Sequence, residues 1–138
     1  MIAGETKIRV RYADTDQMKM VYYSRYFEYF EECRSDLLRG LGMPYPELER
    51  LGFYLPVIEA HANYIKSARY DDLITVKATV NEPPQARIRI EYEVRGDANG
   101  ELLATGHTIH GFISAASGKP TRAPEEFIKR FTIANSHS

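Results

Sequence analysis

The sequence predicts an α+β fold in which a five-stranded antiparallel sheet is covered by one long helix. Residues 6–12, 74–80 and 88–94 alternate apolar and polar side chains with the period of two that is typical of half-buried strands. Residues 24–38 instead repeat apolar side chains at steps of three and four, as amphipathic helices do. No other segment is long and apolar enough to cover the sheet, so this helix is expected against its apolar face.

The first strand is expected over residues 6–12. Its alternation assigns Ile8, Val10 and Tyr12 to one face of the sheet and the intervening basic residues to the other. The polar residues 13–17 break this alternation and are expected to form a loop.

The helix is expected to begin after Ser24, which is a favourable N-cap residue, and to reach about Leu38. Gly40 and Gly42 are suited to its C-terminal end, and two prolines precede a short second helical segment at 47–51. Its predicted buried positions are Tyr26, Phe30, Cys33 and Leu37.

All remaining segments after Gly52 are predicted to be strands and turns. The turns are expected at 81–84 and 96–100, where Pro, Gly, Asn and Asp gather. The polar tail 134–138 is expected to be frayed. The strands are expected at 57–65, 74–80, 88–94 and 102–115, the last three as an antiparallel meander.

Length and composition limit the classes of function. A chain of 138 residues with 43% apolar residues fits a single domain over residues 1–138. A formal charge of −1 without a polybasic run disfavours nucleic-acid binding. No apolar run approaches the ~18 residues of a membrane span, and no leader peptide is recognisable, so a cytoplasmic protein without integral membrane association is expected.

Neither cysteine nor histidine indicates a metal site. Cys33 is the only cysteine, so no internal disulfide is expected, and its place on the apolar helix face favours a packing residue over a reactive thiol. His61, His107 and His110 lie in strand patterns without the acidic partners of a metal site or a catalytic triad. We expect them to be surface or core residues.

Two carboxylates, Asp14 and Asp16, lie in the loop before the helix and allow two interpretations. As turn or capping residues they would accept backbone N–H groups. As a catalytic group, one of them would attack a substrate or activate water beside the free N–H groups of a helix N-terminus, which can hold a developing oxyanion. Spacing alone does not decide between these interpretations.

A resemblance favours the catalytic interpretation. The run from Arg11 to Arg34 contains DTD, VYY, Tyr26 and YFE, and ARYDD follows at 68–72. This combination resembles the 4-hydroxybenzoyl-CoA thioesterase-like hotdog family, and most closely its Tol-Pal-associated bacterial acyl-CoA thioesterase branch. The resemblance implies a hotdog fold, an acyl-CoA thioesterase without a cofactor, and a small-to-medium acyl- or aroyl-CoA substrate.

The resemblance also implies the catalytic residues. The family's catalytic carboxylate corresponds to Asp16, acting as nucleophile or general base, and its oxyanion donor corresponds to the backbone N–H of Tyr23. The sequence departs from the family at Met18 and Lys19, where glycine is common, and at Tyr23, where the branch often has histidine. Glycine would permit positive φ or close approach of a ligand, so the shape of this loop is left open.

Candidate residues for substrate binding, and an expected assembly, complete the prediction. Tyr22 is a candidate for the acyl pocket, although aromatic residues at helical spacing are more often core residues. Coenzyme A carries phosphates, for which Lys66, Arg87 and Arg122 are candidate partners by their positions at strand ends, with a solvated surface role as the alternative for each. The family builds its active site between subunits, which implies a homodimer or homotetramer.

Two other functional classes compete with a thioesterase. A non-catalytic acyl-CoA-binding hotdog protein would keep the fold without turnover, and an unrelated interaction domain would bind no CoA. Hotdog hydratases and dehydratases use a histidine near the helix, and no histidine occurs between Met1 and Ala60. The sequence therefore favours hydrolysis over hydration.

Overall fold

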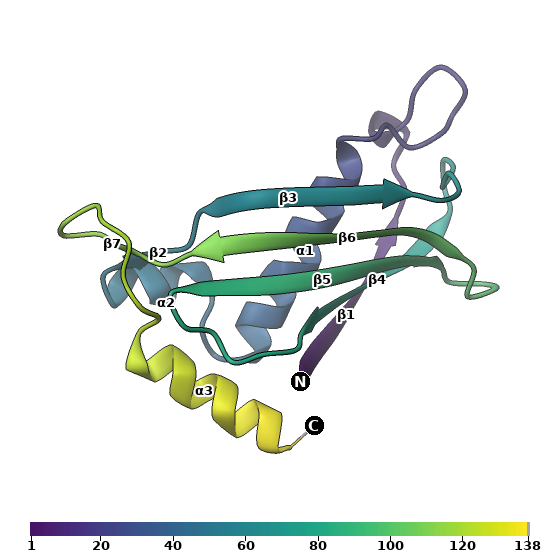
Figure 1. Cartoon of the computed structure of the whole chain (residues 1–138). Coiled ribbons are helices and arrows are strands. Elements are labelled where there is room, and N and C mark those ends of the chain that lie inside the picture. Colours follow the sequence, from purple (N-terminus) through teal and green to yellow (C-terminus); the bar gives the residue numbers. More distant parts are fainter. Residues whose placement is uncertain (138) are drawn as a thin grey trace.

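The computed structural model describes residues 1–137, with a five-stranded antiparallel sheet and a long helix across one of its faces (Figure 1). The strands of this sheet lie in the order β1-β4-β5-β6-β3. Their bounds are Ile2–Arg9 for β1, Val57–Tyr64 for β3, Leu73–Val80 for β4, Arg87–Gly96 for β5 and Leu102–Gly111 for β6. This is the predicted hotdog arrangement, with β4, β5 and β6 as the predicted meander.

Alternation of side chains sets the register of the meander. In β4 and β5 every second residue is buried, from Ile74 to Val80 and from Ile88 to Val94. β1 pairs with β4 from Ile2 opposite Val80 to Arg9 opposite Leu73, and β3 closes the other side against β6. A slip of one residue would turn the apolar face to water, so the burial pattern specifies this register.

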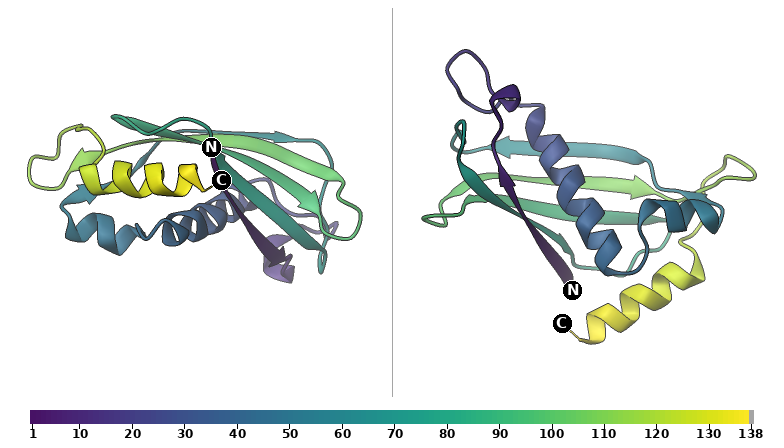
Figure 2. Two further views of the ribbon diagram at one scale, coloured as in Figure 1. Left: turned by 90° about the horizontal axis from the view of Figure 1, so that it is seen from below. Right: turned by 180° about the vertical axis from the view of Figure 1, so that it is seen from behind.

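Helix α1, Arg25–Gly40, lies across the apolar face of the sheet (Figure 2). Tyr26, Phe30, Cys33 and Leu37 are all buried, as predicted. The Phe30 ring stacks on that of Tyr92 from β5, with centroids 4.4 Å apart. A Cβ at Gly106 would lie 2.6 Å from the Phe30 ring and 2.5 Å from the His61 carbonyl oxygen, so only glycine permits this close approach of helix and sheet.

The ends of the predicted elements require corrections. β1 ends at Arg9 and Tyr12–Asp14 forms a 3₁₀ turn, so Tyr12 is exposed and does not lie on the buried face. The Asp14 side chain accepts the Arg11 N–H, which helps to close this turn and end the strand. Ser24 precedes α1, but its side chain forms no capping hydrogen bond.

The last predicted strand is also shorter than expected. β6 ends at Gly111, and Ile113–Ser114 forms a separate strand, β7, paired with β2 at Phe53–Tyr54. The short helical segment is present as α2, Tyr45–Arg50.

The C-terminal helix α3, Glu125–Ser136, was not predicted, and it corrects both the expectation of strands and turns after Gly52 and that of a frayed tail. Phe127 and Phe131, four residues apart, are buried, and Phe127 contacts Phe112 edge-on with ring centroids 5.3 Å apart. The terminal amino group of Met1 donates to the Asn135 side chain, which agrees with the neighbouring termini in Figures 1 and 2. Ser138 lies outside the described residues.

Candidate active site

The loop between β1 and α1 projects beyond one end of the sheet (Figure 1) and forms a small hairpin of its own. Thr15 and Val21 form an antiparallel bridge. Within it, the Asp16 N–H donates to the Met20 carbonyl at 2.9 Å, and the Lys19 N–H donates to the Asp16 carbonyl at 3.0 Å. Lys19 has φ 61°, a conformation that favours glycine. The loop thus adopts, at Lys19, a backbone conformation that glycine would adopt with less strain.

Asp16 holds this turn through one carboxylate oxygen. Its Oδ1 accepts the N–H groups of Met18 at 2.8 Å and Met20 at 3.2 Å. Within residues 1–137 its Oδ2 has no hydrogen-bond partner, and the side chain is half-buried. The turn interpretation of Asp16 is therefore correct for one oxygen, and the other keeps its lone pairs for a substrate or a water molecule.

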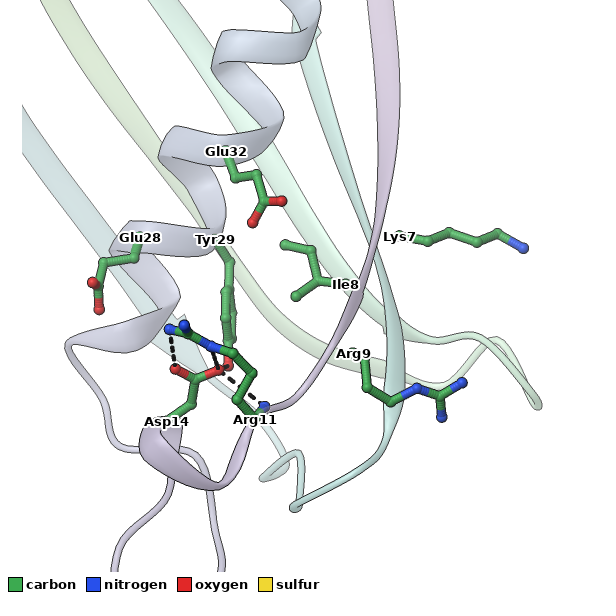
Figure 3. Close-up of a pocket in the computed structure, with 8 residues that line it drawn as sticks. All are labelled: Lys7, Ile8, Arg9, Arg11, Asp14, Glu28, Tyr29 and Glu32. Atoms are coloured by element: carbon green, nitrogen blue, oxygen red, sulfur yellow. Dashed lines mark hydrogen bonds and ion pairs between the residues drawn. The ribbon is translucent and has the colours of Figure 1, made fainter.

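Asp14 differs because its carboxylate is buried and fully engaged (Figure 3). It accepts the Arg11 N–H at 3.1 Å, the Arg11 guanidinium at 3.0 Å and the Tyr29 hydroxyl at 3.1 Å. Burial raises the pKa of Asp14, but the hydrogen bonds from Arg11 and Tyr29 together lower it by more than burial raises it. The net pKa therefore lies below its usual value. Burial and the neighbouring Asp14 raise the pKa of Tyr29, which keeps its hydroxyl a donor.

The Arg11, Asp14 and Tyr29 cluster was not predicted from the sequence as an anchor of the loop. It lines a pocket of about 400 Å³ between β1 and α1. Figure 3 shows the Arg11 side chain lying over the Asp14 carboxylate, whereas Lys7 points away. The signal in the sequence was the spacing of three residues between Arg11 and Asp14, which suits a closed turn.

The start of α1 offers a free backbone donor close to this hairpin. The Val21 N–H donates to the Ala68 carbonyl at 3.0 Å, and the Tyr22 N–H donates to the Asp14 carbonyl at 2.9 Å. The next amide, that of Tyr23, has no acceptor among residues 1–137. An unpaired N–H at a helix N-terminus is the kind of donor that stabilises an oxyanion.

The tyrosines around the loop divide into core and surface residues. Tyr26 and Tyr29 are buried, which confirms Tyr26 as a core residue. Tyr22 is 57% exposed and Tyr23 64%, with ring centroids 6.1 Å apart. Tyr22 therefore lies on the open surface beside the hairpin rather than in the core.

The three candidate phosphate-binding residues are divided between the two ends of the sheet. The Lys66 N–H donates to the Leu103 carbonyl at the end that carries the Asp16 loop, and its Nζ pairs with Glu101 at 2.9 Å. Arg87 begins β5 opposite Gly111, at the other end. Arg122 lies near Arg87, because the adjacent Ala123 N–H donates to the Gln85 carbonyl at 2.7 Å. One copy of the chain brings only Lys66 to the Asp16 end.

The histidines and the cysteine lie outside this site. His107 and His61 stack on the sheet with ring centroids 5.4 Å apart, and His107 contacts Glu59 at 2.8 Å. Burial raises the pKa of the Cys33 thiol to about 11, which agrees with a packing role. In the part of the chain that the structure describes, no group of three His, Cys, Asp or Glu side chains is arranged to hold a metal ion, and no helix there is long and apolar enough to cross a membrane.

Comparison with known families assigns the chain. The model of the thioesterase-like superfamily matches residues 10–131, which include the hairpin, α1 and the whole meander. The chain belongs to this superfamily. The expectation of a thioester hydrolase is therefore confirmed at the level of the family, and an unrelated interaction domain is excluded.

Individual members of the superfamily are similar at about the same level. The chain is 30% identical to the acyl-CoA thioesterase YbgC of Haemophilus influenzae, covering 86% of this chain and 87% of that protein. It is 29% identical to the putative acyl-CoA thioesterase YneP of Bacillus subtilis, covering 92% and 91%. The solved DHNA-CoA thioesterase of Staphylococcus aureus is 32% identical, covers 99% of this chain and 93% of its own, and superimposes with a TM-score of 0.89. These identities do not single out one branch of the superfamily.

Proposed function

We propose that this protein hydrolyses the thioester of a small-to-medium acyl- or aroyl-CoA to free acid and CoA, with Asp16 and the Tyr23 amide as its catalytic groups. The observation that carries the proposal is that the two oxygens of the Asp16 carboxylate differ in their hydrogen bonding. Two backbone N–H groups hold Oδ1, while Oδ2 has no partner within residues 1–137. A carboxylate fixed in this way needs no partner base to act as a nucleophile.

Two routes use the same oxygen. In one, Oδ2 attacks the thioester carbon, the C–S bond breaks, and water then hydrolyses the resulting anhydride to the acid and free Asp16. In the other, Oδ2 takes a proton from water as the water oxygen attacks the same carbon. In both, the carbonyl oxygen gains negative charge that the Tyr23 N–H stabilises, and the CoA thiolate leaves and is protonated.

The names of similar proteins support the substrate class. They include acyl-CoA thioesterases and an aroyl-CoA thioesterase, the DHNA-CoA enzyme. Within the family we assign the chain to the Tol-Pal-associated branch on its DTD and VYY segments. The exposed ring of Tyr22 beside the hairpin is suited to contact the acyl or aroyl group.

A second copy of the chain would complete the CoA site. Arg87 and Arg122 lie at the end of the sheet away from Asp16, so they reach an Asp16 site only if it belongs to another subunit. Edge strand β3 is exposed along most of its length, which leaves backbone groups available for pairing. A homodimer or homotetramer with Lys66 from one copy and the two arginines from another is the arrangement we propose.

Release of free thiol tests the catalytic proposal. Short, medium, long and aromatic acyl-CoAs are compared for wild type, Asp16→Asn and the surface control Asp36→Asn. We expect Asp16→Asn to lower kcat by about 10²-fold or more and Asp36→Asn to leave it unchanged. Binding of CoA esters without turnover in wild type, and with equal affinity in Asp16→Asn, would instead establish the non-catalytic binding protein.

Mixed oligomers test the shared site. Asp16→Asn subunits and Arg87→Ala/Arg122→Ala subunits, each weakly active alone, are unfolded together, refolded and assayed. If the site is shared between two copies, random pairing restores about a quarter of the wild-type sites, because each mixed dimer contains one intact site. Light scattering on the same samples gives the oligomeric state, and a mixture that is no more active than its parts would contradict a shared site.

A further inference from the structure

A tyrosine at the end of edge strand β3 contacts the backbone at the start of α1. The Tyr64 hydroxyl donates to the Tyr23 carbonyl at 3.1 Å, across 41 residues of sequence. The Tyr64 ring lies 4.9 Å from the Tyr23 ring and 5.3 Å from the Tyr26 ring, centroid to centroid. Both the ring and the hydroxyl of Tyr64 therefore contact the first turn of the helix.

This bond acts on the residue whose amide is the proposed oxyanion donor. Only the φ and ψ torsions of Tyr23 separate its N–H from its carbonyl, because the peptide groups themselves are planar. On the N-terminal side, the Tyr22 N–H is held by the Asp14 carbonyl at 2.9 Å. On the C-terminal side, the Tyr23 carbonyl accepts the Tyr26 N–H at the longer distance of 3.3 Å. The hydroxyl of Tyr64 is the shorter of the two contacts that fix this carbonyl.

The helix start has no side-chain cap that would replace this contact. Ser24 forms no capping hydrogen bond, and the Tyr23 side chain is largely exposed. Burial, and then the neighbouring Tyr23, raise the pKa of Tyr64, so its hydroxyl stays protonated and donates at neutral pH. Residues Tyr22 to Ser24 are thus held through their backbone, from Asp14 on one side and Tyr64 on the other.

The geometry points to Tyr64 as a positioning residue, which orients the Tyr23 amide for the oxyanion by holding the Tyr23 carbonyl. The inference rests on the proposed function, since it deepens the role given to that amide. Tyr64 itself touches neither the scissile carbonyl nor Asp16 in this arrangement. Its loss therefore affects the transition state, where the oxyanion forms, more than the binding of the ground-state thioester.

Tyr64→Phe separates the hydroxyl from the ring, because phenylalanine keeps the packing against Tyr23 and Tyr26. The control is Tyr54→Phe, which removes the hydroxyl of another half-exposed tyrosine, in β2. With the acyl-CoA that wild type hydrolyses fastest, we expect kcat of Tyr64→Phe to fall about five- to tenfold and KM to stay within about twofold. The control should match wild type, and an unchanged kcat in Tyr64→Phe would overturn the inference.

A second readout does not depend on turnover. The carbonyl-carbon NMR shift of Tyr23 reports the hydrogen bond that this carbonyl accepts, and the retained phenyl ring keeps the ring-current contribution nearly constant. We expect this shift to change in Tyr64→Phe and not in Tyr54→Phe. An unchanged shift would overturn the contact itself. Absence of thioesterase activity in wild type would contradict the proposed function, while the shift would still decide whether Tyr64 holds the Tyr23 peptide.

Discussion

The hairpin before α1 and a buried polar network beneath α1 differ in whether their polar groups have hydrogen-bond partners. The network consists of Arg34, Tyr92, Thr108 and His110. In the network, Arg34 donates to the Tyr92 hydroxyl at 3.2 Å, Tyr92 bonds to Thr108 at 2.8 Å, and Thr108 bonds to His110 at 2.9 Å. His110 then bonds to the Leu55 carbonyl at 3.2 Å. Arg34 can only donate and the Leu55 carbonyl can only accept. Each group between them therefore donates to the next, in the order Tyr92, Thr108, His110.

At the hairpin and the start of α1, by contrast, the Oδ2 of Asp16 and the N–H of Tyr23 are without partners inside residues 1–137. Backbone N–H groups hold the other carboxylate oxygen of Asp16, and Tyr64 holds the carbonyl of Tyr23. Buried groups that satisfy one another contribute to stability and specify the core. Fixed groups with unused hydrogen-bonding capacity are available for chemistry. Substitutions in the two regions should therefore separate stability from catalysis.

The largest expected effect is at the two acids of the hairpin, which should respond differently. Asp14→Asn places an amide N–H₂ or a weaker acceptor against two donors, Arg11 and Tyr29, and we expect it to lower the free energy of unfolding by about 3 kcal/mol. Asp16→Asn should leave stability within about 1 kcal/mol of wild type while it abolishes most turnover. Urea denaturation beside the thiol-release assay measures both. Equal losses of stability in the two variants would show that Asp16 is mainly a structural residue.

The core network should make stability depend on pH through His110. Burial, and then Arg34, lower the pKa of His110 from 6.5 to about 4 in the folded protein. The unfolded chain binds a proton to His110 as the pH falls through 6.5, whereas the folded protein stays neutral there until about pH 4. Stability is therefore full above pH 6.5 and falls by about 3 kcal/mol on the way down to pH 4.

Denaturation of wild type and His110→Gln across this pH range tests the assignment. We expect the variant to be less stable at pH 7 but to lose most of the pH dependence between pH 6.5 and 4. His107→Gln, on the sheet surface, is the control and should retain the wild-type slope. A His110→Gln slope as steep as that of wild type would assign the dependence to other groups, but not to Asp14, whose lowered pKa places its titration below this pH range.

Removal of one hydroxyl from the network should affect stability alone. Tyr92→Phe keeps the stacking on Phe30 but removes a partner from both Arg34 and Thr108. We expect a loss of about 2 kcal/mol, since a buried donor is then left with fewer acceptors. At a temperature where the variant is fully folded, kcat should match wild type. A drop in kcat under that condition would mean that the core network and the hairpin are coupled.

The sequence specified the fold better than the hydrogen bonding of the site. The apolar alternation of β4 and β5 and the stripe from Tyr26 to Leu37 predicted the sheet and its covering helix, because burial of whole faces is a periodic property. Helix α3 was missed although Pro124, two glutamates and the pair Phe127 and Phe131 mark it. Spacing alone did not distinguish Asp14 from Asp16, and only the family resemblance assigned catalysis to Asp16. Their different hydrogen bonding depends partly on long-range contacts, such as the Tyr29 hydroxyl on Asp14, which no local pattern predicts.

Lys19 offers the smallest and most local test of the hairpin. Its φ of 61° costs an L-residue about 1 kcal/mol, and glycine would regain only part of this because it raises the conformational entropy of the unfolded chain. We expect Lys19→Gly to raise the free energy of unfolding by about 0.5 kcal/mol. Met18→Gly, at a position without positive φ, should lower it by about as much.

The expected difference between these neighbouring variants is about 1 kcal/mol by urea denaturation. Effects on the unfolded chain largely cancel in this difference, because both variants replace an exposed side chain by glycine in the same turn. Lys19→Gly should keep the wild-type kcat, since the backbone that presents Asp16 is unchanged. If both variants are equally destabilised, the Lys19 side chain must make a contact within the free protein that compensates for the strain of its backbone. A fall in kcat or a rise in KM for Lys19→Gly alone would instead assign its ammonium group to the coenzyme.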